Sequence, residues 1–286
     1  MLNYSLLFIA TLAFALTSII QKTYTTKNGG KDKVVLYNLL EALFCSLLYL
    51  ILFSTQIEWN AKVLPYCLLW AGFATISLTS LFMAIKTGPL SLTSLLMQLS
   101  LILVTIYGLL FWNESFTLLK GIGIALIILS LVFNFTPDKN SNKINIKWLI
   151  FAILAMVCNA GTAIVQRQEQ IDFNGEFGNM MLLFSELSVV AILFIALLFS
   201  SKDGNILFIK KYTKFPLMKG VIQAVLNIGL ILLATRMPSA IVYPILAAGS
   251  LIIVYTIATT VYKEKLSIKK MIGVIVAIVA IVLLNI

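Results

Sequence analysis

Histidine is absent from this chain of 286 residues, and charged residues make up only 11% of it. Without histidine there is no His-based acid–base or nucleophilic catalysis, no HExxH zinc site and no histidine-ligated haem. A soluble domain has roughly 25% charged residues, so the 21 basic and 11 acidic side chains are too few to cover a water-exposed surface. These shortages exclude a soluble enzyme and a disordered chain.

Cysteine and acidic clusters are also scarce. The three cysteines, Cys45, Cys67 and Cys158, lie inside apolar stretches, so a secreted disulfide scaffold is not indicated. All four aspartates fall between apolar stretches, which excludes an intramembrane aspartyl pair, and the sequence has no glycine-rich phosphate loop. We therefore expect no enzymatic activity, no cofactor and no metal site.

Apolar residues, by contrast, are abundant. They make up 60% of the chain, and the mean hydropathy is +1.02. A transmembrane helix needs about 20 predominantly apolar residues, and ten segments reach that length. They span roughly 3–21, 34–54, 63–85, 89–112, 117–135, 148–166, 177–200, 215–235, 239–261 and 267–285. The predicted fold is an all-α membrane protein with ten transmembrane helices.

The two halves of the chain resemble each other. Residues 84–133 align with 234–283 at an offset of 150 without a gap, and the matches include Glu114 with Glu264, Lys120 with Lys270 and Gly123 with Gly273. At an offset of 145 the first two helices of each half match as well, with Gln21 on Gln166 and Glu41 on Glu186. This internal repeat predicts a first five-helix half at 1–136, a linker at 137–147 and a second half at 148–286.

An odd number of spans per half makes the second half enter the membrane from the opposite side, which gives an inverted repeat typical of secondary transporters. The charges agree, because 17 of the 21 basic residues lie in or beside the odd-numbered connections. Basic residues collect on the cytoplasmic side, so both termini are expected outside, in a multi-pass protein of the cell membrane. The net charge of +10 is thereby explained without a nucleic-acid partner.

Each half has an alanine, an apolar helix, a glutamate and a glycine nine residues after that glutamate. These residues are Ala84, Glu114 and Gly123, and then Ala234, Glu264 and Gly273, with Pro238 and Pro244 after the second alanine. The pattern resembles the ten-helix EamA-type permeases of the drug/metabolite transporter superfamily, over nearly the whole chain. The resemblance implies two inverted repeats that carry a small solute by alternating access.

Two acids lie deep inside predicted spans. Glu41 is about eight residues into the second helix, or roughly 12 Å at 1.5 Å per residue, and Glu186 has a similar depth in the seventh. The repeat should bring them to symmetric places beside one central cavity. An acid at that depth needs a partner or a watery cavity, so they are candidates for binding protons or cations. The alternative is a structural hydrogen bond, for Glu41 to Asn38 or Tyr37.

Other polar residues fall on single helix faces at spacings of three and four. They are Ser94 and Gln98, then Asn159, Thr162 and Gln166, then Gln223 and Asn227, while Tyr243 stands beside Pro244. As a set with the two acids they predict a polar site for a solute or protons, made by Glu41, Glu186, Asn38, Gln98, Asn159, Gln166, Gln223, Asn227 and Tyr243. For each one alone, a hydrogen bond between helices is the alternative. Glu114 and Glu264 are expected to cap the helices that follow them.

These features predict a secondary transporter of a small organic metabolite or cationic solute that works by alternating access. Export or exchange is the default within the superfamily, and uptake of a cationic nutrient is the alternative within transport. Proton coupling and facilitated exchange stay open, as do a monomer and a homodimer. The competing interpretation is a non-transporting membrane protein, either a lipid-modifying enzyme or a structural subunit. The expected partners are the solute, the lipid bilayer and, under coupling, protons.

Overall fold

The computed structural model describes residues 2–27, 33–53, 57–112, 117–135, 145–200, 205–234, 239–264 and 267–284. The described elements are α1 (Leu2–Lys27), α2 (Val34–Phe53), the 3-10 turn η1 (Ala61–Val63), α3 (Leu64–Thr87), α4 (Leu90–Phe111), α5 (Leu118–Phe135), α6 (Ile146–Asp172), α7 (Gly178–Leu198), α8 (Asn205–Tyr212), α9 (Lys214–Ala234), α10 (Ser239–Thr260) and α11 (Ile268–Leu284). All of these elements are helical, so the prediction of an all-α membrane protein is confirmed.

Ten of the described helices have 17 to 27 residues and follow the order of the ten predicted spans. Apolar segments form helices in a bilayer, because a helix lets each segment satisfy its backbone hydrogen bonds internally where no water is present. Over the described residues α1, α2, α3, α6 and α7 are long and apolar enough to cross a membrane, and shorter apolar stretches lie in α4, α10 and α11. The sequence did not predict α8, which has only eight residues.

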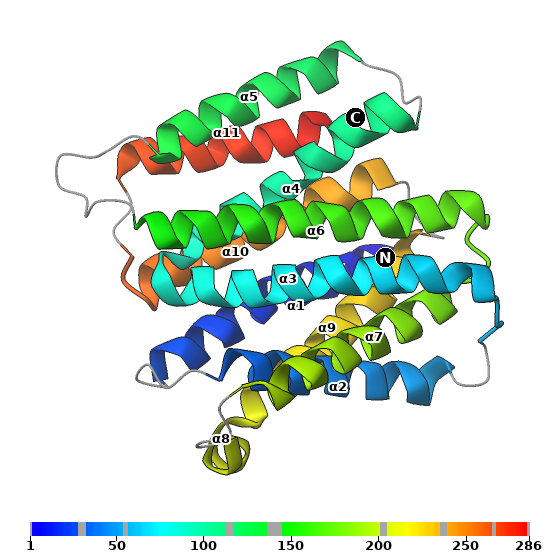
Figure 1. Cartoon of the computed structure of the whole chain (residues 1–286). Coiled ribbons are helices and arrows are strands. Elements are labelled where there is room, and N and C mark those ends of the chain that lie inside the picture. Colours follow the sequence, from blue (N-terminus) through cyan, green and yellow to red (C-terminus); the bar gives the residue numbers. More distant parts are fainter. Residues whose placement is uncertain are drawn as a thin grey trace.

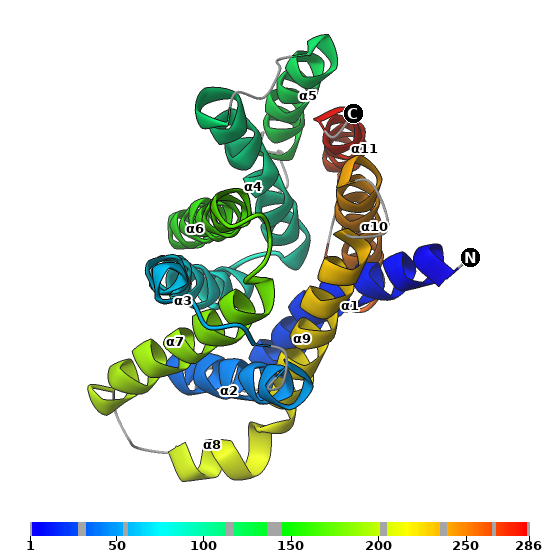
Figure 2. The same ribbon diagram turned by 90° about the vertical axis from the view of Figure 1, so that its right-hand side faces the viewer.

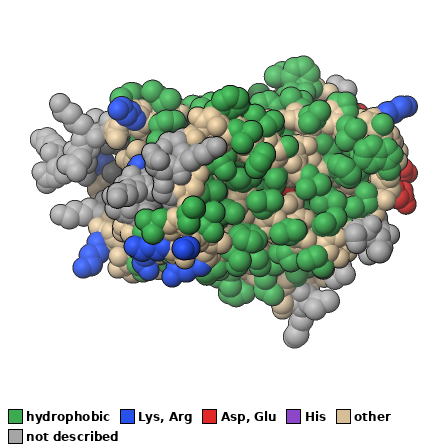
Figure 3. Space-filling view, turned by 60° about the horizontal axis from the view of Figure 1, so that its bottom comes forward, with side chains coloured by type: hydrophobic (Ala, Val, Ile, Leu, Met, Phe, Trp, Pro, Cys, Tyr) green, Lys and Arg blue, Asp and Glu red, His purple; other side chains and the backbone are tan. Residues whose placement is uncertain are grey.

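The long helices run along the molecule, so their connections gather at two ends (Figure 1). The end with the connections α1–α2, α3–α4, α5–α6, α7–α9 and α10–α11 is termed the basic end, where Lys27 and Lys210 lie. The opposite end is termed the acidic end, where Glu58, Asp172 and Glu176 lie. Figure 3 shows basic side chains gathered at one end of one face and acidic side chains at the other, where a basic side chain is also visible, with apolar side chains between the two ends.

The surface between these ends is apolar. Large hydrophobic side chains point outward on several helices, with Ile51 73% exposed, Leu110 69% and Leu68 61%. Such a surface would associate in water, whereas in a bilayer it contacts lipid tails. The apolar belt therefore fits a protein that spans a membrane.

The two halves pack in one repeated pattern. In chain order, α1 to α5 correspond to α6, α7, α9, α10 and α11. The contact of α3 with α6 then matches α1 with α9, α2 with α9 matches α7 with α3, and α4 with α6 matches α10 with α1. The pairs α2–α7, α4–α10 and α5–α11 join counterparts directly. Viewed along the helices, α3, α6 and α7 face α1, α9 and α10 (Figure 2). Exchanging the halves leaves these pairings unchanged, as an inverted repeat requires.

Orientation can be tested with single cysteines at two exposed positions, Asn174 at the acidic end and Lys211 at the basic end. The three native cysteines are buried and should give little background. Because lysines favour the cytoplasmic side, an impermeant maleimide added to intact cells should label Asn174→Cys and spare Lys211→Cys. The opposite labelling pattern would show that the charge argument gives the wrong orientation.

Candidate functional site

A cavity of about 310 Å³ lies among the helices of the bundle. Eight helices contribute residues to its wall, namely α1, α2, α3, α4, α6, α7, α9 and α10. Each half of the chain supplies four of them. Cavities of this size hold small organic molecules, so the bundle has room for a solute between its two halves.

The structure brings most of the predicted site residues together on this wall. Seven of the nine line the cavity: Glu41, Glu186, Gln98, Asn159, Gln166, Gln223 and Asn227. Asn38 is fully buried in α2 and is not among the lining residues. Tyr243 belongs to α10, but its side chain lies outside the described residues. The polar helix faces inferred from spacing thus converge on one place.

A buried ion pair forms part of the wall. The Lys219 ammonium lies 2.8 Å from the Glu41 carboxylate, and both side chains are almost fully buried. The same ammonium donates a 2.7 Å hydrogen bond to the side-chain carbonyl of Gln21. A buried charge requires an opposite charge and hydrogen-bond partners; here Glu41 supplies Lys219 with the opposite charge, and Gln21 accepts its hydrogen bond.

A glycine next to Lys219 allows this pairing. A Cβ at Gly220 would lie 2.5 Å from the backbone carbonyl oxygen of Glu41, which is too close for any larger residue to fit without a shift of the backbone. Helix α9 can therefore approach α2 this closely only at a glycine. The close approach brings Lys219 within reach of the Glu41 carboxylate.

Two expectations from the sequence are wrong here. The 17 basic residues counted in or beside the odd-numbered connections include Lys219, whereas the structure buries it, 3% exposed, on the cavity wall. The structural alternative for Glu41 was a hydrogen bond to Asn38 or Tyr37, yet its carboxylate pairs with Lys219. Helical spacing held the missed signal, because Lys219 lies four residues before Gln223 and hence on the same face of α9.

Glu186 lines the same cavity without an ion pair. Its side chain is 7% exposed, and no described lysine or arginine forms a salt bridge with it. Its carboxyl lies beside Cys45 and experiences the charges of Lys219 and Glu41. The described wall has one lysine for two glutamates, so one acid in the cavity lacks a base that neutralises it.

Amide side chains bridge the two halves at the wall. Gln98 donates a 2.9 Å hydrogen bond to the Ser250 hydroxyl, and Asn159 donates a 2.9 Å hydrogen bond to the Ser100 hydroxyl. The two serines are repeat counterparts at the offset of 150, so each half accepts one such bond. An amide has a second donor and a carbonyl oxygen, which leaves groups that can meet a solute.

A further pair of amides lies on α9. Gln223 donates to the side-chain carbonyl of Asn227 over 3.1 Å, and Asn227 donates to the Tyr49 hydroxyl over 2.7 Å. These bonds fix the orientation of Asn227 on the wall. The aromatic residue comes from α2, which also carries Glu41, so the polar groups of α2 and α9 form one connected surface.

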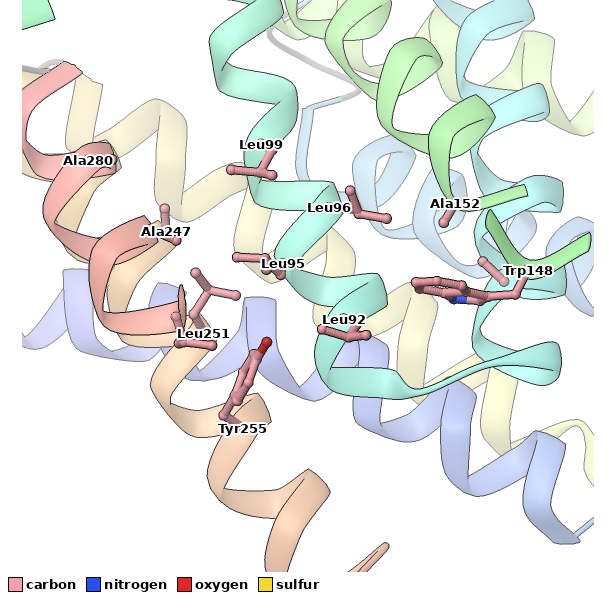
Figure 4. Packing of buried hydrophobic residues seen from close by; sticks show 13 residues of the cluster. Leu92, Leu95, Leu96, Leu99, Trp148, Ala152, Ala247, Leu251, Tyr255 and Ala280 are labelled. Carbon is pink, nitrogen blue, oxygen red and sulfur yellow. The ribbon is translucent and has the colours of Figure 1, made fainter. Parts of the chain in front are cut away.

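Helices α4 and α10 pack together toward the basic end. Leu95 in the first half of α4 and Leu251 in the second half of α10 are fully buried and point toward each other, with Tyr255 nearby (Figure 4). The repeat counterpart of Leu95 is Ile245, toward the acidic end, and it is 43% exposed where Leu95 is 0%. Leu95 is therefore buried in a contact at the basic end, whereas its repeat counterpart, Ile245, is not buried in a matching contact at the acidic end.

Glu264 fastens α4 at the basic end. Its carboxylate accepts hydrogen bonds from the backbone N–H groups of Leu90 and Ser91, at 2.6 and 3.2 Å, and from the Ser91 hydroxyl at 2.6 Å. A carboxylate in this position caps the N-terminus of a helix and complements its dipole. The expected cap on the following helix is wrong, because Glu264 caps a helix of the other half. Its counterpart, Glu114, lies outside the described residues.

Equivalent positions also meet at both ends of the bundle. At the basic end the hydroxyls of Thr23 and Tyr262 lie 2.7 Å apart. At the acidic end the indole N–H of Trp112 donates a 2.7 Å hydrogen bond to Gln168. The repeat offsets place Thr23 on Gln168 and Trp112 on Tyr262. A comparison by residue identity misses this correspondence, since the bonds are equivalent and the residue types differ.

The sequence matches the model of the EamA-like transporter family over residues 1–136 and again over 146–286. The chain belongs to the EamA-like transporter family. This finding confirms the resemblance inferred from the repeated glutamates and glycines. One solved structure, described only as the crystal structure of a protein, is similar with a TM-score of 0.58 and 13% identity over 96% of this chain and 95% of its own. At that identity the likeness shows a shared fold alone. A search of the curated proteins gives no significant match.

As a member of the EamA-like transporter family, the protein is a multi-pass membrane protein of the transporter type. Its cavity then has a ready interpretation as the place where a solute is held, because pockets between the helices of a bundle are common ligand sites. The charges, amides and apolar residues of the wall define the chemistry that such a solute meets.

The role of the bridging amides can be tested with Gln98→Ala. Loss of one hydrogen bond to a solute should weaken its binding roughly threefold to tenfold, and loss of the bond to Ser250 should cost about 0.6 kcal/mol in the free energy of unfolding. Thr256→Ala is the matched control, since Thr256 is bonded only within its own exposed helix face. Unchanged binding in Gln98→Ala together with a lower melting temperature would assign Gln98 to packing alone.

Proposed function

We propose that the protein is a secondary transporter that exports or exchanges a small organic solute with a cationic group, coupled to protons. The observation that carries this proposal is the carboxyl of Glu186, which forms no ion pair with any described lysine or arginine in a cavity where Lys219 already neutralises Glu41. A lone acid in such surroundings can hold one proton or one solute cation at a time. Competition for Glu186 couples the movement of the two in opposite directions.

The remainder of the wall supports a solute with an apolar body and one charged group. Trp70 lines the cavity together with Glu186, and an aromatic face beside a carboxylate favours an alkylammonium group. Leu226 and Leu246 contribute apolar surface on the side of α9 and α10. A ligand of this kind gains from burial of its body and from its charge at Glu186.

Alternating access is supported by the difference between the two ends. At the basic end, α4 and α10 meet through Leu95 and Leu251, and Glu264 holds the start of α4. At the acidic end, the equivalent residue Ile245 is exposed. An inverted repeat can exchange these two arrangements between its halves, which would close the acidic end and open the basic one around a fixed central site.

This account predicts a specific effect of Glu264→Gln. A neutral amide caps a helix less well than a carboxylate, because it loses the favourable interaction with the helix dipole and cannot accept all three hydrogen bonds equally. Hydrogen exchange at the backbone amides of Leu90 and Ser91 should become at least several-fold faster, as measured by mass spectrometry of the peptide that contains them. Exchange at wild-type rates would show that this cap does not hold the basic end shut.

Orientation follows from the charges. With the basic end in the cytoplasm, both termini face outward, and the end at which Ile245 is exposed faces the outside of the cell membrane. Protons would enter from that side, and a solute collected from the cytoplasm would leave toward it. The same geometry permits exchange of one solute for another when no pH gradient is present.

The proposal is tested with the purified full-length protein in two steps. Small amines, amino acids and quaternary ammonium compounds are screened for a rise in melting temperature, which reports ligands that bind the folded state. The ligand with the largest rise is then used, radiolabelled, in exchange assays with proteoliposomes. Exchange of the labelled ligand is the expected result, and binding without any movement across the membrane would contradict a transport function.

A further inference from the structure

A third buried glutamate, Glu169, lies in α6 near the acidic end and is not among the residues that line the cavity. Its side chain is 0% exposed, and neither carboxyl oxygen has a hydrogen-bond partner. No described lysine or arginine forms a salt bridge with it. An ionised carboxylate in this situation is strongly disfavoured, so the natural occupant of the site is a proton.

Glu169 continues the polar face of α6 that lines the cavity. Asn159, Thr162, Gln166 and Glu169 are separated by three, four and three residues, which places them on one stripe of a helix. The first three line the cavity, and Glu169 extends the stripe toward the acidic end. A line of polar groups therefore runs from the cavity to this carboxyl.

On the outer side, Glu169 is close to a surface carboxylate. Asp172 lies one turn further along α6, is exposed, and accepts hydrogen bonds from the Tyr66 hydroxyl and, at 2.9 Å, from Gln168. Its charge acts on Glu169. Asp172 is in contact with water at the acidic end and can deliver a proton from there.

On the inner side, small polar groups lie between Glu169 and Glu186, and among the described residues neither the Glu169 oxygens nor the Ser185 hydroxyl has a hydrogen-bond partner. The Cys67 thiol experiences the charge of Glu169 and lies beside the Ser185 hydroxyl. Ser185 borders a void of about 10 Å³, together with Gln166 and Glu186. That volume is close to the space that one water molecule occupies, so a single water can join the Ser185 hydroxyl to the Glu186 carboxyl.

The described groups that act on Glu169 include no positive charge that would favour its ionised form. The ionisable groups that act on it are Asp172 on its own helix and Tyr66 and Cys67 on α3. The neighbouring part of α7 contributes Met180 and Met181, which carry no charge, to the surrounding apolar cluster. The described residues of α3 and α7 beside Glu169 therefore bring no positive charge to the site.

The basic end has no matching acid. The repeat counterpart of Glu169 at the offset of 145 is Tyr24, which is fully buried against the aromatic rings of Tyr37, Phe82 and Phe208. This aromatic cluster has no carboxyl group that could bind a proton. The line of groups is therefore a property of one end only, even though the fold repeats.

We propose that Glu169 is a proton-loading site that passes protons from the acidic end to Glu186 along a route separate from that of the solute. A proton from water or Asp172 binds the Glu169 carboxylate. It then moves through the Cys67 thiol, the Ser185 hydroxyl and the water-sized void as these side chains rotate into hydrogen-bonding contact, each giving up one proton as it takes one, to the Glu186 carboxylate. One proton enters and one arrives, with no change in any other bond. The end point, Glu186, rests on the proposed function.

A rapid pH drop applied to the full-length protein in detergent tests this route. Trp70 lines both the cavity and the small void beside Glu186, so its fluorescence should report protonation of Glu186, and Trp70→Phe identifies that signal. Glu169→Gln should slow the relaxation at least tenfold and leave its final amplitude unchanged. Ser185→Ala should slow it as well, and Glu169→Asp, which keeps the carboxyl, should restore most of the rate.

The controls separate this inference from the proposed function. Glu176→Gln removes an exposed acid at the same end and should relax at the wild-type rate. Wild-type relaxation in Glu169→Gln and Ser185→Ala overturns the route while Glu186 keeps its role. A fluorescence relaxation that persists in Glu186→Gln overturns the role of Glu186 itself. If the wild-type protein shows no fluorescence relaxation that depends on Trp70, both the route and the role of Glu186 are overturned.

Discussion

Glu186→Gln should abolish accumulation of solute driven by a pH gradient and spare exchange between equal pools of solute. Glutamine keeps the shape and hydrogen bonding of the side chain but cannot bind and release a proton. Coupling to protons requires that a proton is bound and released at this position. Exchange of solute requires only that the cavity opens alternately to the two sides of the membrane. The measurement is uptake of the labelled solute into proteoliposomes, with and without an inward gradient of protons.

Glu41→Gln is the matched variant, because Glu41 is the repeat counterpart and lines the same cavity. Its carboxylate is already paired with Lys219, so its loss should leave the coupling mechanism with Glu186 intact and lower the melting temperature instead. Full accumulation in a Glu41→Gln/Glu186→Gln double variant would remove both residues from coupling and leave them as structural groups.

Lys219→Met should be the most destabilising single change in the cavity. It leaves Glu41 charged, buried and without a base, and breaking a buried ion pair from one side costs about 3–5 kcal/mol. The hydrogen bond to Gln21 is lost as well. The loss in the free energy of unfolding should shrink at low pH, where a proton neutralises Glu41. Thermal unfolding of the purified protein at several pH values measures both effects.

Its control is the double variant Glu41→Gln/Lys219→Met. Removing both charges avoids an uncompensated carboxylate, and replacement of a whole buried pair by neutral groups is often close to neutral in stability. The double variant should therefore melt well above Lys219→Met. A double variant as unstable as the single one would mean that Lys219 stabilises the protein through packing rather than through its charge.

The general architecture could be predicted from the sequence because a bilayer leaves little choice. Apolar segments of the right length must be helices, and the recurrence of Glu114 at Glu264 and of Glu41 at Glu186 exposes the repeat. Polar spacing on α6 and α9 was sufficient to find the cavity wall. These inferences depend on the length of apolar segments, on matches between the two halves and on spacing along one helix, all of which can be read directly from the sequence.

Pairings between helices could not be predicted in the same way. Lys219 was counted with the basic residues in or beside the odd-numbered connections, and only the close approach at Gly220 shows that it meets Glu41. Glu264 caps α4 rather than the next helix because the two halves interlock in space. Helix α8 escaped detection since eight residues are too few for a clear periodic signal. Glu169 continues a visible stripe, but its burial emerges only from packing.

Alternating exposure of the cavity is the central claim, and it can be measured without knowing the solute. Ser18, a lining residue, is replaced by cysteine in a variant without the three native cysteines, and a charged, impermeant thiol reagent is applied from each side of oriented vesicles. Ser18→Cys should react from the acidic end in the resting protein and from the basic end after Glu264→Gln is added. Reaction from both ends at once, or from neither end in either background, would contradict the account.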